Sequence, residues 1–212
     1  MSTTDLLQPE GGWAQPEQVR LPPPPPAKRG LLFRTMALAS RWFGRPELPR
    51  VFPVLNINRR IFPAWLFFAS RLMPFGKLPA TVREKLILRV AWHCRSRYEW
   101  GQHVEIALRV GVSDAEIAAI AREQAAGDSP ADQLLMRVCD DLCQTKLIAP
   151  ENWQALNAAW SQPDIVEMLM LIGHYQMIAG LLINAGIALE PSIEEVLQAL
   201  HRRLADAQPQ PE

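Results

Sequence analysis

The chain has 212 residues, of which 49% are hydrophobic and 21% charged, and its formal net charge is zero. A chain of this length and composition can form one domain of ordinary size with a full hydrophobic core. The zero net charge argues against a general nucleic-acid-binding protein, because such proteins carry an excess of basic residues that attracts phosphates.

The charge is unevenly distributed along the chain. Residues 51–110 contain ten Lys or Arg and three Asp or Glu, a charge of +7, whereas residues 111–212 contain five and fifteen, a charge of −10. One interpretation is that the two parts pack on each other, or on a neighbouring subunit, with complementary charge. The other is that the basic part attracts an anionic substrate.

The cysteine count and the apolar segments bear on the cellular compartment. Three cysteines without the spacing of a disulfide framework suit a reducing cytosol. The first residues lack the basic and apolar regions of a secretory signal. The most apolar run, residues 168–183, has 16 residues, whereas a membrane-spanning helix needs roughly 20. We therefore expect a cytoplasmic protein, with this run as a buried core helix.

Periodicity, prolines and capping signals predict a tail followed by a single helical domain. Residues 1–27, with five consecutive prolines at 22–26, are expected to be a disordered or loosely draped tail. The domain is expected over 28–206, with a frayed tail at 207–212. No segment shows the alternation of a β-strand, so the fold is predicted to be an all-α bundle of about seven to nine helices. The expected helices cover residues 28–43, 59–73, 82–92, 97–109, 114–121, 131–144, 150–160, 163–185 and 193–204.

Capping signals place several helix ends. Ser113 and Glu116 have the spacing of a capping box. Asp164 is expected to cap the long apolar helix, which Gly186 ends, and Ser192 is expected to cap the last helix.

The stretch from 81 to 111 contains two further capping boxes. Thr81 and Glu84 predict a helix that begins near residue 82, and Ser96 and Glu99 predict a second helix from residue 97. In one straight helix Glu84 and His103 would lie about 28 Å apart, at a rise of ~1.5 Å per residue. A break near residues 94–96 allows the second helix to fold back, so that the two side chains can meet.

Ser96, Glu99 and His103 lie on one face of the second helix, at i, i+3 and i+7. A Glu and His pair is the smallest set that can move a proton. The alternative is structural, since both glutamates can serve only in capping boxes and His103 can be a half-buried core residue. Cys139 and Cys143, at i and i+4, are expected to be small buried residues rather than metal ligands.

These residues carry a resemblance to a known family. The segments Arg83-Glu84, Ser96-Arg-Tyr-Glu-Trp-Gly-Gln-His103, Gly111-Val-Ser-Asp-Ala-Glu-Ile117 and Ile172-Gly-His-Tyr-Gln-Met177 resemble the carboxymuconolactone decarboxylase family, which includes the alkyl hydroperoxidase D-like proteins. The likeness covers about residues 45–190. It implies an all-α fold built round a helical hairpin and a homo-oligomer, such as a dimer, trimer or hexamer.

The resemblance also implies roles for individual residues. Glu84 and His103 fall on the family's glutamate and histidine, whereas Ser96 and Glu99 fall on the two cysteines of its peroxidase branch. Cys94 is two residues out of register. A dithiol peroxidase needs a thiolate and a resolving thiol in place, so that activity is not expected.

The sequence therefore favours a lyase-type enzyme that uses neither metal nor organic cofactor and acts on a small anionic carboxylate or lactone. Its catalytic candidates are Glu84, His103, Glu99 and Ser96, and its substrate-binding candidates are Tyr98, Trp100, Arg97, His174 and Tyr175. Arg83 or Arg95 are further candidates to hold a carboxylate. Two alternatives remain open: a redox protein in which Cys94 works with an external thiol, and a non-catalytic oligomeric binding or scaffold protein. Neither nucleic acid nor membrane is expected as a partner.

Overall fold

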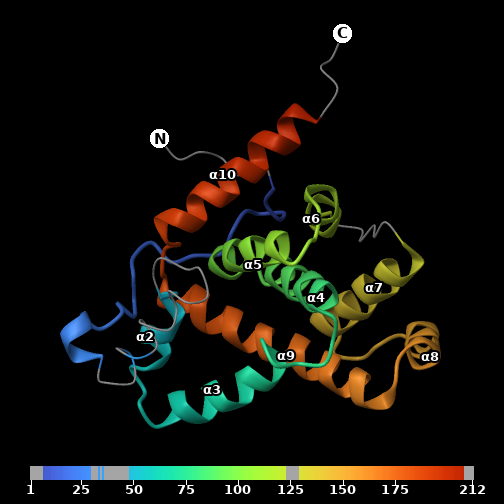
Figure 1. Ribbon diagram of the computed structural model, residues 1–212, viewed down its shortest axis with the longest axis horizontal. Helices are drawn as coiled ribbons and strands as arrows, with labels where there is room; N and C mark the ends of the chain where they lie inside the picture. The colour runs from blue at the N-terminus through green and yellow to red at the C-terminus, as the bar shows by residue number, and fades with distance from the viewer. Residues whose placement is uncertain (1–6, 30–32, 34, 36–47, 123–128, 208–212) are drawn as a thin grey trace.

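A computed structural model describes residues 7–29, 33, 35, 48–122 and 129–207. Over these residues the chain forms nine α-helices and one short 3₁₀ turn, η1 (Pro26–Lys28), with no strand, so the predicted all-α fold is confirmed (Figure 1). The helices are α2 (Val51–Leu55), α3 (Ile61–Leu72), α4 (Ala80–His93), α5 (Arg97–Arg109), α6 (Asp114–Ile120), α7 (Pro130–Gln144), α8 (Pro150–Ala159), α9 (Gln162–Ala185) and α10 (Pro191–Asp206). The helix expected over 28–43 lies mostly outside the described residues.

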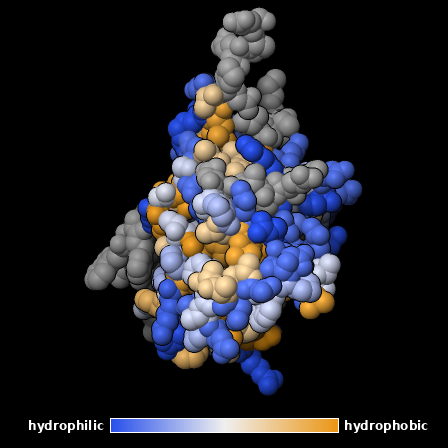
Figure 2. Space-filling model, turned by 90° about the vertical axis from the view of Figure 1, so that its right-hand side faces the viewer, coloured by the Kyte–Doolittle hydropathy of each residue, from blue (hydrophilic) through white to orange (hydrophobic). Residues whose placement is uncertain are grey.

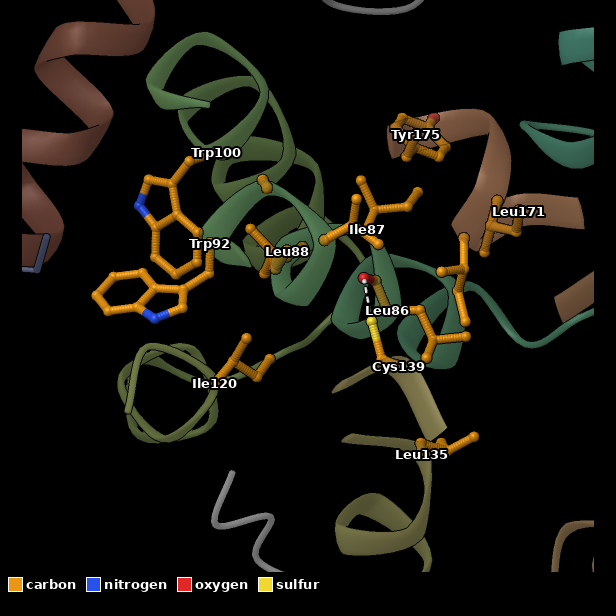
Figure 3. Close-up of a cluster of buried hydrophobic side chains, with 14 of the residues drawn as sticks. Leu86, Ile87, Leu88, Trp92, Trp100, Ile120, Leu135, Cys139, Leu171 and Tyr175 are labelled. Carbon is orange, nitrogen blue, oxygen red and sulfur yellow. Dashed lines mark hydrogen bonds between the residues drawn. The ribbon is translucent and has the colours of Figure 1, made fainter. Parts of the chain in front are cut away.

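Helix α4 lies at the centre of the bundle. Every residue from Arg83 to Trp92 is buried, because α5, α6, α7 and α9 all pack against this helix. Figure 3 shows the core that results, in which Leu86, Ile87 and Leu88 of α4 meet side chains of α5, α6, α7 and α9. A helix surrounded on all sides has no polar face, so its charged side chains must find partners inside the protein.

The chain reverses between α4 and α5, as the sequence predicted. Cys94 is the C-cap of α4, Arg95 has a positive φ of 57°, and Ser96 is extended at the N-cap of α5. The amide of Ser96 donates to the carbonyl of Ala91 at 2.9 Å, which closes the turn. The two helices therefore pack against each other as a hairpin.

The N-terminal segment differs from the disordered tail expected over 1–27. Residues 7–29 are described, and Trp13 packs with its ring 5.8 Å from that of Trp92 and 5.9 Å from that of Trp100. The guanidinium of Arg95 donates to the carbonyls of Gly11 and Gly12 at 2.5–2.6 Å. Prolines remove backbone donors but do not prevent such contacts, since one tryptophan can anchor a segment by burying its ring.

Two of the predicted helix ends are confirmed and two are corrected. The capping box of Ser113 and Glu116 is present, and Gly186 ends α9 with a φ of 69°. However, Ser161 rather than Asp164 caps α9, and α10 begins at Pro191 without a side-chain cap, so Ser192 is not its N-cap. The serine three residues before Asp164 competes successfully because its hydroxyl accepts from the Asp164 amide.

The charge asymmetry is explained by pairing inside the chain. Lys85 of α4 pairs with Glu116 at 2.6 Å and with Asp132 at 2.9 Å. Arg89, which is fully buried, pairs with Asp140 at 2.6 Å and also donates to the backbone carbonyls of Ile120 and Arg122, at and just after the end of α6. The basic part of the sequence thus packs on the acidic part, as the first interpretation of the charge pattern proposed.

Helix α9 is long and apolar enough to cross a membrane by length and composition, the one such helix in the described ranges, yet it packs against α3, α4, α5, α7 and α8. Half of its most apolar window is buried inside the protein, which fits the predicted core helix. The surface in Figure 2 is mainly hydrophilic, with hydrophobic residues exposed near its middle. Large exposed apolar side chains on or beside α3 and α9 are Ile61, Phe67, Phe75, Val166, Met170 and Met177.

Candidate active site

Glu84 and His103 form the centre of the candidate site. The α4–α5 hairpin brings the Glu84 Oε2 atom to 2.7 Å from His103 Nδ1, although the residues are 19 positions apart. Glu84 is 0% exposed and His103 is 7% exposed. A hydrogen-bonded carboxylate and imidazole shielded from water form a pair in which one side chain can orient the other and pass a proton.

Arg83 lies beside this pair. Its Nε atom is 3.6 Å from Glu84 Oε1, and its side chain is 8% exposed. Neither Arg83 Nε nor Glu84 Oε1 has a hydrogen-bond partner among the described residues. The two atoms face each other as a long ion pair, so each retains capacity for a shorter hydrogen bond to a ligand.

The two capping boxes predicted for this hairpin are not formed. α4 begins after Pro79 without a side-chain cap, and the carboxylate of Glu84 turns to His103 instead of the helix start. Ser96 does stand at the N-cap of α5, but its hydroxyl caps no amide. Within the described ranges, Ser96 Oγ and both carboxyl oxygens of Glu99 are buried without a hydrogen-bond partner. The structural interpretation of these three residues as caps is therefore wrong, because none of their side chains makes the capping bond.

Glu99 is a buried acid with a raised pKa. Its side chain is 2% exposed, and burial raises its pKa well above the ordinary value, with a further contribution from the charge of Cys143. A protonated carboxyl group is a hydrogen-bond donor. Ser96 and Glu99 therefore place a hydroxyl and a carboxylic acid on the same helix face as His103.

Tyr175 of α9 closes the other side of His103. The two rings lie 4.9 Å apart and perpendicular, and the Tyr175 hydroxyl donates to the sulfur of Met73 at 3.2 Å. Burial, followed by the charges of Glu84 and Glu99, raises the pKa of Tyr175, so its hydroxyl stays protonated. Tyr175 thus lies beside His103 and Met73, and its part in substrate binding stays a prediction.

His174 extends the site towards α3. Its ring stacks on Trp65 at 5.9 Å and meets the edge of Phe68 at 5.4 Å. Burial, and then the charge of His103, lowers the pKa of His174 to about 4, so it is neutral at pH 7. The structure describes no hydrogen-bond partner for His174 Nδ1 or Trp65 Nε1. The sequence analysis did not single out Trp65 or Phe68, whose i, i+3 spacing on α3 places them on one helix face.

Three predicted substrate-binding residues point away from the pair. Arg97 forms a two-point ion pair with Glu194 of α10 at 2.5 and 2.9 Å. The Tyr98 hydroxyl donates to Glu190 at 2.9 Å, and Trp100 is buried against Trp92 and the N-terminal segment. Positions 97 and 98 lie on other faces of α5 than 96, 99 and 103, since successive helical residues turn by about 100°. Position 100 lies next to 96 around the helix, and its ring packs on Trp92 and Trp13. Arg95 holds backbone carbonyls, which leaves Arg83 as the arginine beside the pair.

No group of three or more His, Cys, Asp or Glu side chains that could hold a metal ion occurs in the part of the chain that the structure describes. The donors at the site are one imidazole, two carboxyl groups, a hydroxyl and a guanidinium. Such a set suits proton transfer and the binding of an anion.

Comparisons with known proteins show which family this part of the chain resembles. Residues 61–140, which contain α3, α4, α5 and α6, match the model of the carboxymuconolactone decarboxylase family. The resemblance seen in the sequence is confirmed. A search of curated protein sequences gave no match.

Solved structures with the same fold include one protein described as peroxidase-related and one described as a debrominase. The chain matches an alkylhydroperoxidase AhpD core protein from Ralstonia eutropha JMP134, described as an uncharacterized peroxidase-related protein, with a TM-score of 0.74 and 16% identity over 84% of this chain and 96% of that one. It matches the debrominase Bmp8, as a cysteine-to-alanine variant in complex with 2,3,4-tribromopyrrole, with a TM-score of 0.72 and 13% identity over 87% of this chain and 98% of that one. The apo form of Bmp8 gives the same TM-score and identity, with 100% of that chain covered.

At these identities the structural matches show the shared fold. The carboxymuconolactone decarboxylase-like hairpin of α4 and α5 carries Glu84, Ser96, Glu99 and His103, so the four catalytic candidates lie within the matched residues. His174 and Tyr175 lie outside them, on α9, and reach the site through packing.

Proposed function

We propose that this protein is a carboxymuconolactone decarboxylase-like enzyme of the lyase type, which performs acid/base chemistry on a small carboxylated or lactone substrate without metal or organic cofactor. The observation that carries the proposal is the buried contact of 2.7 Å between Glu84 Oε2 and His103 Nδ1. If Glu84 and His103 had only a structural role, the buried polar atoms around them would be expected to have hydrogen-bond partners. Instead, its immediate neighbours retain buried polar atoms without protein partners in the described structure.

The geometry supports a division of roles. When Glu84 accepts the Nδ1 proton of His103, it fixes the imidazole so that Nε2 exchanges a proton with the substrate. Arg83, whose Nε forms an ion pair of 3.6 Å with Glu84 but no hydrogen bond, is placed to bind a substrate carboxylate or carbonyl oxygen. Loss of CO₂ breaks a carbon–carbon bond and leaves its electron pair on an enolate, which the neutral acid Glu99 stabilises by a hydrogen bond and the imidazolium of His103 reprotonates.

The dithiol chemistry of the family's peroxidase branch is disfavoured at this position. Ser96 and Glu99 stand where that branch has its two cysteines, and neither can supply a thiolate. A hydroxyl and a carboxylic acid keep hydrogen-bond donors at the same places, which suits stabilisation of an anion rather than reduction of a peroxide.

The proposal is tested with a panel of small lactones and β-keto acids, assayed by release of CO₂. Wild-type turnover is expected to fall by about 10²–10⁴-fold in Glu84→Gln and His103→Ala, because each change removes one partner of the proton relay. Arg83→Gln is expected mainly to raise KM. Arg97→Gln is the matched control, since this arginine pairs with α10 and should leave turnover unchanged. Turnover that is equal in wild type, Glu84→Gln and His103→Ala would refute the relay.

The protein is further proposed to be a cytoplasmic homo-oligomer. Exposed phenylalanine and methionine side chains along α3 and α9, such as Phe67 at 67% and Met177 at 56%, are typical of a surface that packs against another subunit. Light scattering of the purified chain should then give a mass above that of one copy, 23.9 kDa. A monomer at micromolar concentration would contradict this assembly.

A further inference from the structure

Helix α3 and the loop that follows it present cationic and aromatic side chains to solvent. Positions 60, 64, 67 and 71 follow one another at i, i+4, i+7 and i+11, so they form one stripe along the helix. The stripe carries Arg60, Phe67 and Arg71, all of them exposed, and Phe75 and Lys77 of the loop are exposed as well. Figure 1 places α3 at the edge of the bundle. These five side chains are called the outer face of α3 below.

The apolar side chains of the outer face are open to water. Phe75 is 73% exposed and Phe67 is 67% exposed. The guanidinium carbon of Arg71 lies 5.1 Å from the centre of the Phe67 ring. Two further apolar side chains flank the face, Ile57 at 48% and Ile61 at 55% exposure. Several large apolar side chains exposed together in a small region are typical of a surface that binds a partner.

The outer face carries positive charge without carboxylates to balance it. Residues 48–83 contain six Lys or Arg and no Asp or Glu. Within the described ranges, Arg60, Arg71 and Lys77 take part in no ion pair. Glu167 of α9 reaches the loop, but its carboxylate accepts from the backbone amide of Lys77 at 2.8 Å. The face therefore needs a partner that supplies negative charge.

The same composition extends along the neighbouring sequence. Residues 28–77 hold ten of the 22 Lys and Arg, one of the 22 Asp and Glu, and all seven phenylalanines of the chain. Basic side chains next to aromatic and aliphatic ones are typical of segments that lie in the headgroup region of a membrane. Anionic lipids attract such segments, because each Lys or Arg near the membrane surface gains from their negative potential.

We infer that the outer face of α3 docks this protein on the surface of a bilayer that contains anionic lipid. Phe67 and Phe75 enter the boundary between headgroups and acyl chains, while Arg60, Arg71 and Lys77 pair with anionic headgroups. The sequence argument against a membrane partner concerned segments that span a bilayer, and a peripheral contact requires none. The inference does not depend on the proton relay at the active site.

A second copy of the chain is a poorer match for the outer face. In a two-fold contact one patch meets itself, so Arg60, Arg71 and Lys77 would face their own copies without a carboxylate between them. Like charges placed together across an interface are unfavourable. Helix α9 contains no Lys or Arg. The subunit contact proposed above is therefore assigned to the exposed side chains of α9, such as Met177, and Phe67 to the lipid.

Sedimentation of the full chain with vesicles tests the inference. The probes are vesicles of phosphatidylcholine alone and vesicles of phosphatidylcholine with about 30% phosphatidylserine, each at low and at physiological salt. The protein is expected to bind the anionic vesicles at least about tenfold more tightly, and this binding should weaken as salt rises. Failure to bind the anionic vesicles, or equal binding to both kinds, would overturn the inference.

Variants with matched changes of charge locate the contact. Arg60→Gln/Arg71→Gln should weaken binding to the anionic vesicles by about 25-fold, since each cation contributes about fivefold. Arg122→Gln/Arg202→Gln is the control, because it removes two exposed arginines after α6 and on α10, and α10 lies at the opposite end of the molecule from α3 (Figure 1). Equal binding by the two double variants would overturn the inference.

The aromatic contribution has its own matched pair. Phe75→Ala should weaken vesicle binding, whereas Trp153→Ala, which removes an aromatic ring that is 45% exposed on α8, should bind as the wild type does. Light scattering without lipid separates the two occupants. The variants of the outer face should keep the mass of the wild type. Loss of self-association in these variants, with vesicle binding unchanged, would assign the face to a second copy and overturn the inference.

The docking inference and the proton relay fail separately. Arg60→Gln/Arg71→Gln should release CO₂ from soluble substrates at the wild-type rate, because neither arginine contacts Glu84 or His103. His103→Ala, which should lose turnover, should bind anionic vesicles as the wild type does.

Discussion

The unpartnered carboxyl group of Glu99 leads to a quantitative prediction about stability and pH. Burial, with the charge of Cys143, raises its pKa in the folded chain well above the ordinary value, whereas the unfolded chain exposes it to water. Between the unfolded and the folded pKa, the folded state holds one proton more than the unfolded state. Stability that is fully present below the unfolded pKa is then lost as the pH rises, by up to about 1.4 kcal/mol per pH unit.

Glu99→Gln keeps the shape of the side chain but cannot ionise, so it should remove this loss. Urea denaturation is followed by tryptophan fluorescence at intervals from pH 5 to pH 7. Over these two pH units the free energy of unfolding of the variant should rise relative to that of the wild type by up to about 2.7 kcal/mol. Glu151→Gln, on the exposed start of α8, is the control and should follow the wild type in parallel. If Glu99→Gln also runs parallel to the wild type, or is less stable at pH 7, Glu99 is an ionised structural group and the neutral-acid role is refuted.

Three further predictions concern packing and charge, and all are measured by urea denaturation of the purified variants. Trp13→Ala should lower the free energy of unfolding by about 2–3 kcal/mol, because it removes the ring that packs on Trp92 and Trp100. An unchanged urea midpoint would mean that the N-terminal segment contributes nothing to stability. Gly101→Ala should cost about 1–3 kcal/mol, because its new Cβ would lie 2.6 Å from a methyl group of the buried Leu189; a neutral effect would show that α10 shifts freely. Arg89→Met should lower the free energy of unfolding by about 3–5 kcal/mol, because it removes the donor of two carbonyls and leaves Asp140 with His93 in place of the arginine; a stabilised variant would contradict this assignment.

The sequence predicted the helices well because their periodicity and breaks are local signals. α5, α6, α7 and α8 begin and end within two residues of their predicted positions, and the turn at Cys94–Ser96 was predicted from the second capping box. The contacts of the N-terminal segment could not be predicted, because a run of prolines shows only what the backbone cannot do. It does not show that Trp13 finds a site between two tryptophans from α4 and α5.

The site was partly predictable for a different reason. Positions 96, 99 and 103 share a helical face whatever the tertiary fold, so periodicity alone grouped Ser96, Glu99 and His103. The partners on α3 and α9 were not predictable by periodicity, because the contact of Trp65 with His174 depends on how two helices about 100 residues apart pack. Sequence alone could not distinguish Arg97 from Arg83, because both are equally basic and the pairing of Arg97 with Glu194 depends on how α10 packs.

The failed capping boxes carry the strongest argument for a function at this hairpin. A capping box and a catalytic helix start have the same spacing, serine or threonine followed by glutamate at the third position, and local sequence cannot separate them. In α6 the same pattern forms both capping bonds on an exposed surface. At α4 and α5 it forms none, and the glutamates are instead buried at 0% and 2% exposure. A chain that needed only helix starts would keep such carboxyl groups at the surface, since burial without a partner costs free energy. We propose that proton chemistry, rather than folding, accounts for the position of these carboxyl groups in the core.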